Sequence, residues 1–323
     1  MKAQQTIVVL LAVSWQAHGQ QPQRMVKAET TAAIAEQEDT GKKPQVSEVV
    51  TATTKTPVVN AMAKRAEAKL VEFPGPDGMK LHGFLYVPEG AGPFPALLWN
   101  HGSGKSPGWQ PELAQFYTSQ GFVFFIPHRH GQGRSASAGE YHVDAEKRCP
   151  SQPDPKACRV KFHELYNRDV VAAVEWLKQR PFVDSHRLAM SGVSYGGIQT
   201  ILTAEKGLGI RGFVPFSPGA MSWANEKLRE RLLEAVQNAG PPIFMLQAKG
   251  DYSIGPFLVL GVFLLGKGGL NSATLYPQFG SSNEEAHGAF AVTNAGIEIW
   301  KAEVLTFLNA AAPPQGTPSN PPQ

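Results

Sequence analysis

The chain has 323 residues, of which 42% are hydrophobic and 18% are charged. That composition supplies enough apolar material for one large core or two small ones. The net charge is +3 and the sequence contains no cluster of lysines and arginines, so a nucleic acid is not an expected partner.

The first 19 residues have the pattern of a secretory signal peptide. Lys2 gives a positive start, residues 7–13 form an apolar run, and Ala-His-Gly at 17–19 gives a small-x-small cleavage site. The run is far shorter than the roughly 20 apolar residues that a spanning helix needs. We therefore predict no stable membrane span and an exported protein, periplasmic or secreted, with a retained anchor as the alternative.

Segments of biased composition flank the predicted folded part. Residues 20–66 are rich in Gln, Thr, Ala, Lys and Glu and contain no aromatic residue, which predicts a disordered linker. Residues 311–323 contain five prolines and are predicted to be a disordered tail. One folded domain is expected over residues 67–310.

Strand and helix patterns alternate along this domain. Residues 69–73 and 80–87, joined by a Pro-Gly-Pro-Asp-Gly turn, predict a hairpin at one sheet edge. Further strands are predicted over 96–99, 122–126, 187–193, 210–216, 243–248 and 273–276. Helices are predicted over 111–120, 162–179, 198–205, 223–238, 254–265 and 294–308. The alternation predicts an α/β fold with a mostly parallel sheet, helices on both faces, and ligands at the carboxyl ends of the strands.

A long loop is predicted over residues 128–161, after Pro127 ends the preceding strand. Cys149 and Cys158 lie in this loop, and in an exported protein we expect them to form a disulfide. Metal binding with His163 as a nearby ligand is the alternative, although two thiols alone make a poor zinc site.

The pattern Gly-x-Ser-x-Gly at residues 192–196 follows a predicted buried strand and precedes a predicted helix. This context is typical of a nucleophile elbow, a strained turn that lifts the serine above the sheet. Glycine is expected at 192 and 196 because a Cβ atom there would meet the neighbouring strand or the following helix. Ser194 is therefore the candidate nucleophile.

Chain order selects the partners of Ser194. In this architecture an acid and then a histidine follow the serine, and His287 is the one histidine after position 194. Asp251 is the one aspartate after that position and comes directly after a predicted strand. Asp251 is therefore the expected orienting acid and His287 the expected base, with Glu284 left open as an alternative acid.

The glycine-rich loop at residues 100–104 is the candidate oxyanion loop because it follows an early strand. We expect the backbone amides of Tyr195 and Ser103 to bind the oxyanion, with Gly102 as the next choice. His101 is expected to brace the loop. Residues 104–106, Gly-Lys-Ser, imitate a phosphate-binding loop, but the required upstream glycine is absent.

With these residues placed, the chain resembles the α/β-hydrolase superfamily and, within it, the dienelactone hydrolase family. The resemblance rests on the motifs at residues 101–103, 130–135, 192–197, 249–251 and 287–290. The namesake enzymes of that family use cysteine as nucleophile, whereas position 194 is serine. The resemblance therefore implies the serine-using branch of carboxylesterases and related acyl hydrolases.

Together these features predict a serine hydrolase that cleaves a small-molecule carboxylic ester through an acyl-enzyme intermediate, without a metal or organic cofactor. A peptidase or other acyl hydrolase of the same fold would keep the same three side chains. A catalytically silent binding protein on the same scaffold is the alternative from another class. The loop at 128–161 and the helix after Asp251 are candidates for the pocket wall.

Overall fold

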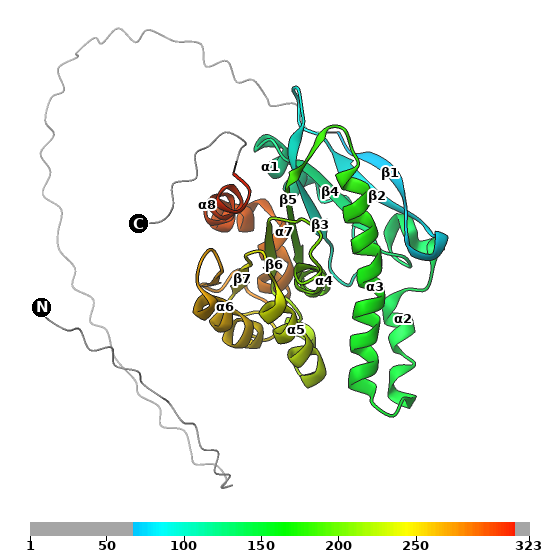
Figure 1. Cartoon of the computed structure of the whole chain (residues 1–323). Helices are drawn as coiled ribbons and strands as arrows, with labels where there is room; N and C mark the ends of the chain where they lie inside the picture. The colour runs from blue at the N-terminus through cyan, green and yellow to red at the C-terminus, as the bar shows by residue number, and fades with distance from the viewer. Residues whose placement is uncertain (1–66, 314–323) are drawn as a thin grey trace, which may run out of the picture. The chain divides into compact units, whose positions relative to one another are not determined.

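Eight strands form one sheet in the computed structural model, which describes residues 67–313 (Figure 1). They are β1 (Lys69–Pro74), β2 (Lys80–Tyr86), β3 (Phe94–Asn100), β4 (Val123–His128), β5 (Val183–Val193), β6 (Gly212–Phe216), β7 (Phe244–Ala248) and β8 (Ser272–Tyr276). Their order in the sheet is β1-β2-β4-β3-β5-β6-β7-β8. Because β2 is antiparallel to both neighbours and the pairs from β4 to β8 are parallel, the predicted α/β fold with its edge hairpin is confirmed.

Helices cover both faces of this sheet. They are α1 (Pro111–Ser119), α2 (His142–Glu146), α3 (Pro155–Lys178), α4 (Tyr195–Ala204), α5 (Glu226–Asn238), α6 (Val262–Lys267), α7 (Phe290–Val292) and α8 (Asn294–Ala311). Within residues 67–313 we find no helix with the length and apolar character that crossing a membrane requires. The predictions for residues 1–66 and for the tail beyond residue 313 lie outside the described residues.

The alternation of side chains along the strands divides the core into two clusters. Ala96 and Leu98 of β3 pack with α3, α4 and α5, whereas Leu97 and Trp99 of the same strand pack with α1 and α8. Successive side chains of a strand point to opposite faces, so a strand with helices on both sides must be apolar throughout. This explains the continuous apolar runs in the sequence, and Figure 1 shows the two helical layers.

The segment predicted as a long loop is partly helical. It contains α2, and α3 begins at Pro155 rather than at residue 162. The proline-rich context concealed this helix start. The Asp154 carboxylate accepts hydrogen bonds from the amides of Lys156 and Ala157, and Pro155 is the first helical residue. Leu165 lies on the exposed side of α3, away from its buried residues such as Val170 and Leu177.

Two further element boundaries differ from the prediction. Strand β4 continues through Pro127 to His128 because its pairing with β3 has already ended at Phe125, so the proline removes no hydrogen bond on that side. Helix α5 begins at Glu226 rather than at residue 223. Asn225 directly precedes this start, and its side chain accepts hydrogen bonds from two amides of the first turn.

Candidate active site

Ser194 lies at the junction of β5 and α4 in a strained backbone conformation, with φ 60° and ψ −117°. A Cβ atom at Gly196 would approach the carbonyl oxygen of Asn100 to 1.9 Å, and one at Gly192 would lie 2.6 Å from the same residue. The glycines therefore let β5 and α4 pass directly beside the end of β3. This close passage presents Ser194 at the carboxyl edge of the sheet.

Asp251 and His287 meet in space although 36 residues separate them in the sequence. The Nδ1 atom of His287 lies 2.7 Å from Oδ1 of Asp251, and both side chains are buried. Asp251 follows β7, and His287 lies in a π-helical turn, Glu285–Ala289, where the sequence had predicted a loop. Glu284, the alternative acid, is exposed. The acid that contacts His287 is therefore Asp251.

Three further contacts fix the Asp251 carboxylate and the chain around it. Gln247 donates from Nε2 to Oδ2 at 2.7 Å, and the Tyr252 amide donates to Oδ1 at 2.6 Å. Asn283 donates to the carbonyl of Gly250 at 2.6 Å, which joins the acid loop to the segment that carries His287. Because these contacts fix the carboxylate, Asp251 accepts the hydrogen bond from His287 Nδ1–H in one orientation.

The Nε2 atom of His287 is buried and has no hydrogen-bond partner among residues 67–313. Donation from Nδ1 to Asp251 leaves Nε2 as the unprotonated, basic nitrogen of the neutral ring. The hydroxyl of Ser194 does not hydrogen-bond to it in this structure. The structure thus joins Asp251 to His287, while Ser194 stands apart from them; such contacts are often long in unliganded enzymes.

A pocket of about 630 Å³ opens above Ser194. Ser103 and Tyr195 line it beside Ser194, and the opposite side is formed by α2, the start of α3 and the segment after β6. The segment at 128–161, which was predicted to be a loop, therefore does contribute to the pocket wall. The segment after Asp251 instead lines a neighbouring hollow of about 540 Å³ through Tyr252 and Ser253.

The predicted disulfide between Cys149 and Cys158 is confirmed, with a Cα–Cα distance of 5.5 Å. It joins the end of the α2 segment to the first turn of α3, and Pro150 beside it lines the pocket. His163, proposed as a metal ligand in the alternative interpretation, is instead buried in the pocket wall. Its ring packs 4.6 Å from the ring of Tyr195, and burial lowers the pKa of His163 to about 4.

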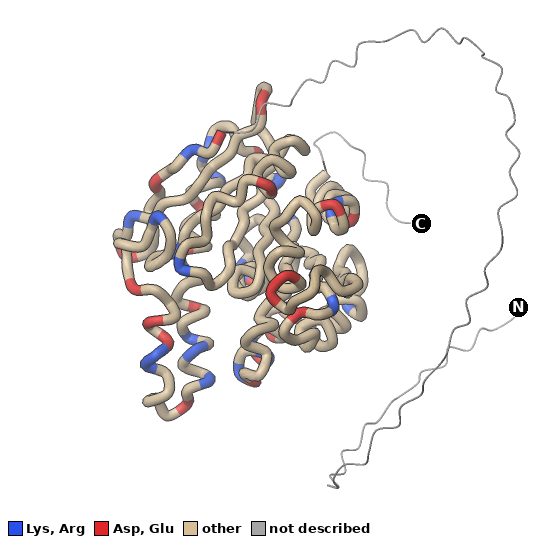
Figure 2. The backbone as a smooth tube through the Cα atoms, turned by 180° about the vertical axis from the view of Figure 1, so that it is seen from behind, with Lys and Arg blue, Asp and Glu red and all other residues tan. Residues whose placement is uncertain are grey.

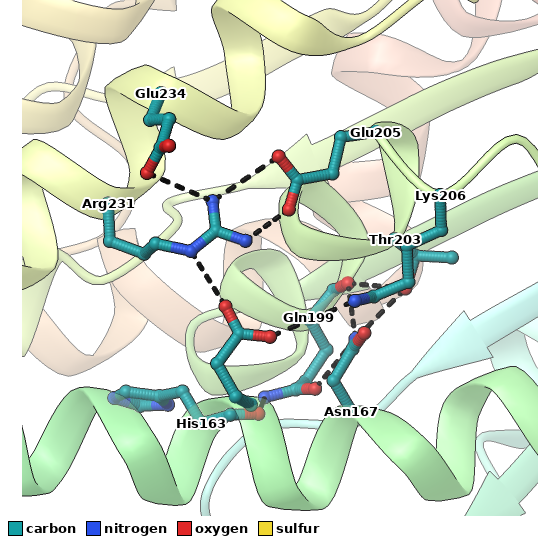
Figure 3. Close-up of polar contacts among 9 residues, drawn as sticks. His163, Asn167, Gln199, Thr203, Glu205, Lys206, Arg231 and Glu234 are labelled. Atoms are coloured by element: carbon teal, nitrogen blue, oxygen red, sulfur yellow. Dashed lines mark hydrogen bonds and ion pairs between the residues drawn. The ribbon is translucent and has the colours of Figure 1, made fainter.

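A polar network behind this wall fixes α3 against α4 and α5 (Figure 3). Gln199 donates to the carbonyl of His163 at 3.1 Å, and Asn167 donates to Gln199 and Thr203. On the outer side, Arg231 of α5 binds the carboxylates of α3 and α4 residues, Glu164 and Glu205. The helix that carries His163 is thereby tied to the helix that begins beside Ser194.

The candidate oxyanion loop, residues 100–104, has contacts that the sequence did not reveal. The carbonyl of Ser103 accepts a hydrogen bond from the Tyr141 hydroxyl at 2.7 Å. Behind the loop, the buried Arg129 side chain donates to His101 Nδ1 at 2.8 Å. Burial and the charge of Arg129 hold the pKa of His101 well below its usual range, so this histidine is neutral. No spacing or motif in the sequence identified Arg129.

Comparison with known proteins agrees with this fold. The acylaminoacyl peptidase of Pyrococcus horikoshii superimposes with a TM-score of 0.59 at 16% identity, over 80% of this chain and 43% of that chain. The esterase Pf2001 of Pyrococcus furiosus superimposes with a TM-score of 0.55 at 17% identity, over 76% of this chain and 94% of that chain. At these identities the likeness concerns the α/β-hydrolase fold.

A curated relative and a family model match at the level of sequence. The polyketide transferase grgF of a Penicillium species is 25% identical over 171 residues, which are 51% of this chain and 49% of the relative. The chain thus spans about half the length of that relative. A model of the X-Pro dipeptidyl-peptidases (S15 family) matches residues 77–252, a segment that includes Ser194 and Asp251. Because this match covers more than half of the sequence, the chain belongs to the S15 family of α/β-hydrolase-fold serine hydrolases.

Proposed function

We propose that this protein hydrolyses a carboxylic ester through an acyl-enzyme intermediate formed on Ser194. The serine hydroxyl attacks the ester carbonyl carbon while Nε2 of His287 takes its proton. The bond to the alcohol then breaks, and His287 returns the proton to the departing alkoxide. In the second half, water attacks the acyl group, His287 takes the water proton, and the acid leaves as Ser194 regains its hydrogen.

The observation that carries this proposal is the 2.7 Å contact between His287 Nδ1 and Asp251 Oδ1. It holds the ring in the tautomer in which Nε2 is basic, and no described residue occupies that nitrogen. The strained elbow presents Ser194 at the same edge of the sheet. The relay requires that substrate binding bring the Ser194 hydroxyl within hydrogen-bond distance of that nitrogen.

The oxyanion is bound by the amides of Tyr195 and Ser103 in this proposal. The Tyr195 amide is the first of α4, and a helix N-terminus has free amides and a favourable dipole for negative charge. Ser103 lies in the same pocket as Ser194. One such donor contributes about 3–4 kcal/mol to stabilisation of the transition state.

Ester and peptide substrates each have a supporting observation. The fold neighbour Pf2001, an esterase, is matched over 94% of its length, and the motifs resemble the dienelactone hydrolases with serine in place of cysteine. Membership of the S15 family and the fold of an acylaminoacyl peptidase favour a peptidase. Purified protein offered a graded series of p-nitrophenyl esters and the matching p-nitroanilides, including an X-Pro p-nitroanilide, separates the two.

Labelling with a fluorophosphonate probe tests the mechanism itself. We expect wild-type protein to be labelled and Ser194→Ala to be unlabelled and inactive, with Ser151→Ala, an exposed serine outside the site, as the matched control. Folded wild-type protein that is neither labelled nor active on esters and anilides would instead support the silent binding protein.

We also propose that the protein is exported. The signal-like residues 1–19 support this, and so does the disulfide, because such bonds persist in oxidising compartments. Fractionation of cells that express the full chain, with mass measurement of the mature N-terminus, tests the proposal. Uncleaved protein in the cytoplasm would contradict it.

A further inference from the structure

Four consecutive carbonyl groups behind the pocket bind two buried side chains that the proposed reaction does not use. The carbonyls of residues 101 and 102 accept from Nη2 of Arg129 at 2.9 and 2.7 Å. Those of residues 103 and 104 accept from Nε2 of Gln132 at 3.2 and 2.8 Å. Arg129 also donates from Nε to Oε1 of Gln132 at 3.1 Å, so the pair acts as one unit, the Arg129–Gln132 clamp.

The clamp, together with Tyr141 and His142, which contact the Ser103 carbonyl at 2.7 and 3.1 Å, determines where the amides of this loop point. In a trans peptide the N–H of the next residue is directed opposite to the carbonyl, so carbonyls held by the clamp turn the following amides away from it. The amides of residues 102–104 donate no hydrogen bond within the described part of the chain. The loop borders Ser194, because a Cβ atom at Gly102 would lie 3.9 Å from the Cβ of that serine.

We propose that Arg129 and Gln132 are positioning residues, which hold the loop at 101–104 so that its amides face the oxyanion formed on Ser194. This inference rests on the proposed function. The oxyanion hole would then contain the adjoining amides of residues 102–104, with that of Ser103 in the middle, rather than one isolated amide from this loop. Such preorganised donors stabilise developing charge without reorganising during the reaction.

The charge of Arg129 supports the same assignment. The side chain is 2% exposed and forms no ion pair with a carboxylate within residues 67–313. Burial lowers the pKa of Arg129 to about 10, so it stays protonated at neutral pH. A buried cation without an acidic partner is costly, and backbone carbonyls are here its acceptors. Its guanidinium also lies 4.9 Å from the ring centre of Tyr195, whose amide is the other proposed donor.

Two substitutions distinguish a role of the clamp in positioning the loop at 101–104 from a role in stabilising the whole fold. Arg129→Lys keeps the charge but loses the planar fork that reaches two carbonyls and Gln132. Gln132→Glu keeps the acceptor for Arg129 Nε and removes the donor to residues 103 and 104. Arg134→Gln, an exposed arginine of the same turn, is the matched control. Each purified full-length variant is measured for kcat and KM on a p-nitrophenyl ester and, by NMR, for the backbone amide order parameters of residues 101–104.

We expect both clamp variants to lose about 100-fold in kcat, with KM within about threefold of wild type. The order parameters of residues 101–104 should fall in both, and Arg134→Gln should match wild type. Partial recovery of kcat by added guanidinium ion in Arg129→Ala would further support the clamp. A folded Gln132→Glu protein with kcat within about threefold of wild type, or with unchanged order parameters at 101–104, would overturn the inference.

Failure of the proposed function is a different result. If wild-type protein neither hydrolyses the substrates nor reacts with the fluorophosphonate, the reaction is wrong. The comparison of order parameters still decides whether the clamp holds the loop, because it requires no activity. If Arg129 variants do not fold, Gln132→Glu provides the decisive measurement.

Discussion

Two sides of the pocket are built by different means. The strand-end side places Ser194 in the pocket wall, with Asp251 and His287 outside that wall at the same edge of the sheet, and it is held by buried hydrogen bonds, such as that between Gln247 and Asp251. The helical wall, formed by α2 and the start of α3, has buried hydrogen bonds at His163 and Asn167, but its outer part is held by the disulfide and by exposed ion pairs. Figure 2 shows charges of both signs along these two helices.

This difference predicts which kinetic parameter each side of the pocket controls. A buried hydrogen bond fixes its partners because leaving either unpaired is costly, whereas an exposed ion pair contributes little. Chemistry needs groups within a fraction of an ångström, and substrate binding tolerates more variation. We therefore expect substitutions on the strand-end side to change kcat or folding, and those in the helical wall to change KM.

Asp251→Asn should have the largest effect. The amide offers an N–H to His287 where the carboxylate accepted one, which reverses the ring tautomer and removes the basic Nε2. We expect kcat to fall by about 10⁴-fold with the fold intact. Steady-state kinetics on a p-nitrophenyl ester measures this, and Glu284→Gln, the neighbouring exposed acid, is the control. Comparable losses in the two variants would contradict the assignment.

Gly196→Ala should be the most destabilising substitution of the set. Its Cβ atom would lie 1.9 Å from a backbone oxygen, which cannot move without separating β3 from β5. We expect a loss of about 3 kcal/mol or more in the free energy of unfolding, measured by denaturant titration. Gly266→Ala in α6 has open space around it and should stabilise by about 0.5 kcal/mol. Equal stability of the two variants would refute the steric argument.

Replacing both cysteines by serine tests the helical wall. Because the bond closes a loop with a sequence separation of 9, its removal should cost about 2–3 kcal/mol. The pocket side of α2 would loosen, so KM should rise while kcat stays within about threefold. Thermal unfolding and ester kinetics measure the two effects. A loss of kcat without a change in KM would mean that this wall also positions the reacting groups.

Low pH should reduce the stability of the fold through His163, the buried histidine of the helical wall. The pKa of His163 is lowered to about 4 by burial, below its value of 6.5 in the unfolded chain. Unfolded chains therefore bind more protons between pH 6.5 and 4, so stability is full above pH 6.5 and is lost as the pH falls through that window. His163→Phe, which keeps the aromatic contact with Tyr195, should lessen the fall of the unfolding midpoint. An unchanged pH profile would contradict this.

The sequence predicted the parts of the fold whose cause is local. The elbow glycines, the apolar strands and the order of Ser194, Asp251 and His287 are patterns along the chain, and the sheet and the Asp251–His287 contact follow from them. The early start of α3 was missed because Pro, Cys and charged residues conceal a capping signal at Asp154. Helix α2 was missed because it is short and no side chain caps its start.

The contacts that position the site could not be predicted in the same way. Arg129 and Gln132 reach residues 101–104 from the turn after β4, and their meeting depends on the pairing of β3 with β4. The burial of His163 against Tyr195 likewise depends on how α3 packs on α4. Such contacts join residues far apart in sequence and have no signature in one chain.

The smallest effect is expected at an exposed ion pair of the helical wall. Lys156 of α3 contacts Glu226 of α5 at 2.6 Å, and the two side chains are 52% and 38% exposed. Solvent and salt screen such pairs, and ordering two long side chains offsets the attraction. Lys156→Met should therefore move the thermal unfolding midpoint by less than about 1 °C and leave KM unchanged. Differential scanning calorimetry at low and high salt measures this. A shift as large as that of the disulfide variant would show that charge, rather than the covalent bond, holds this wall in place.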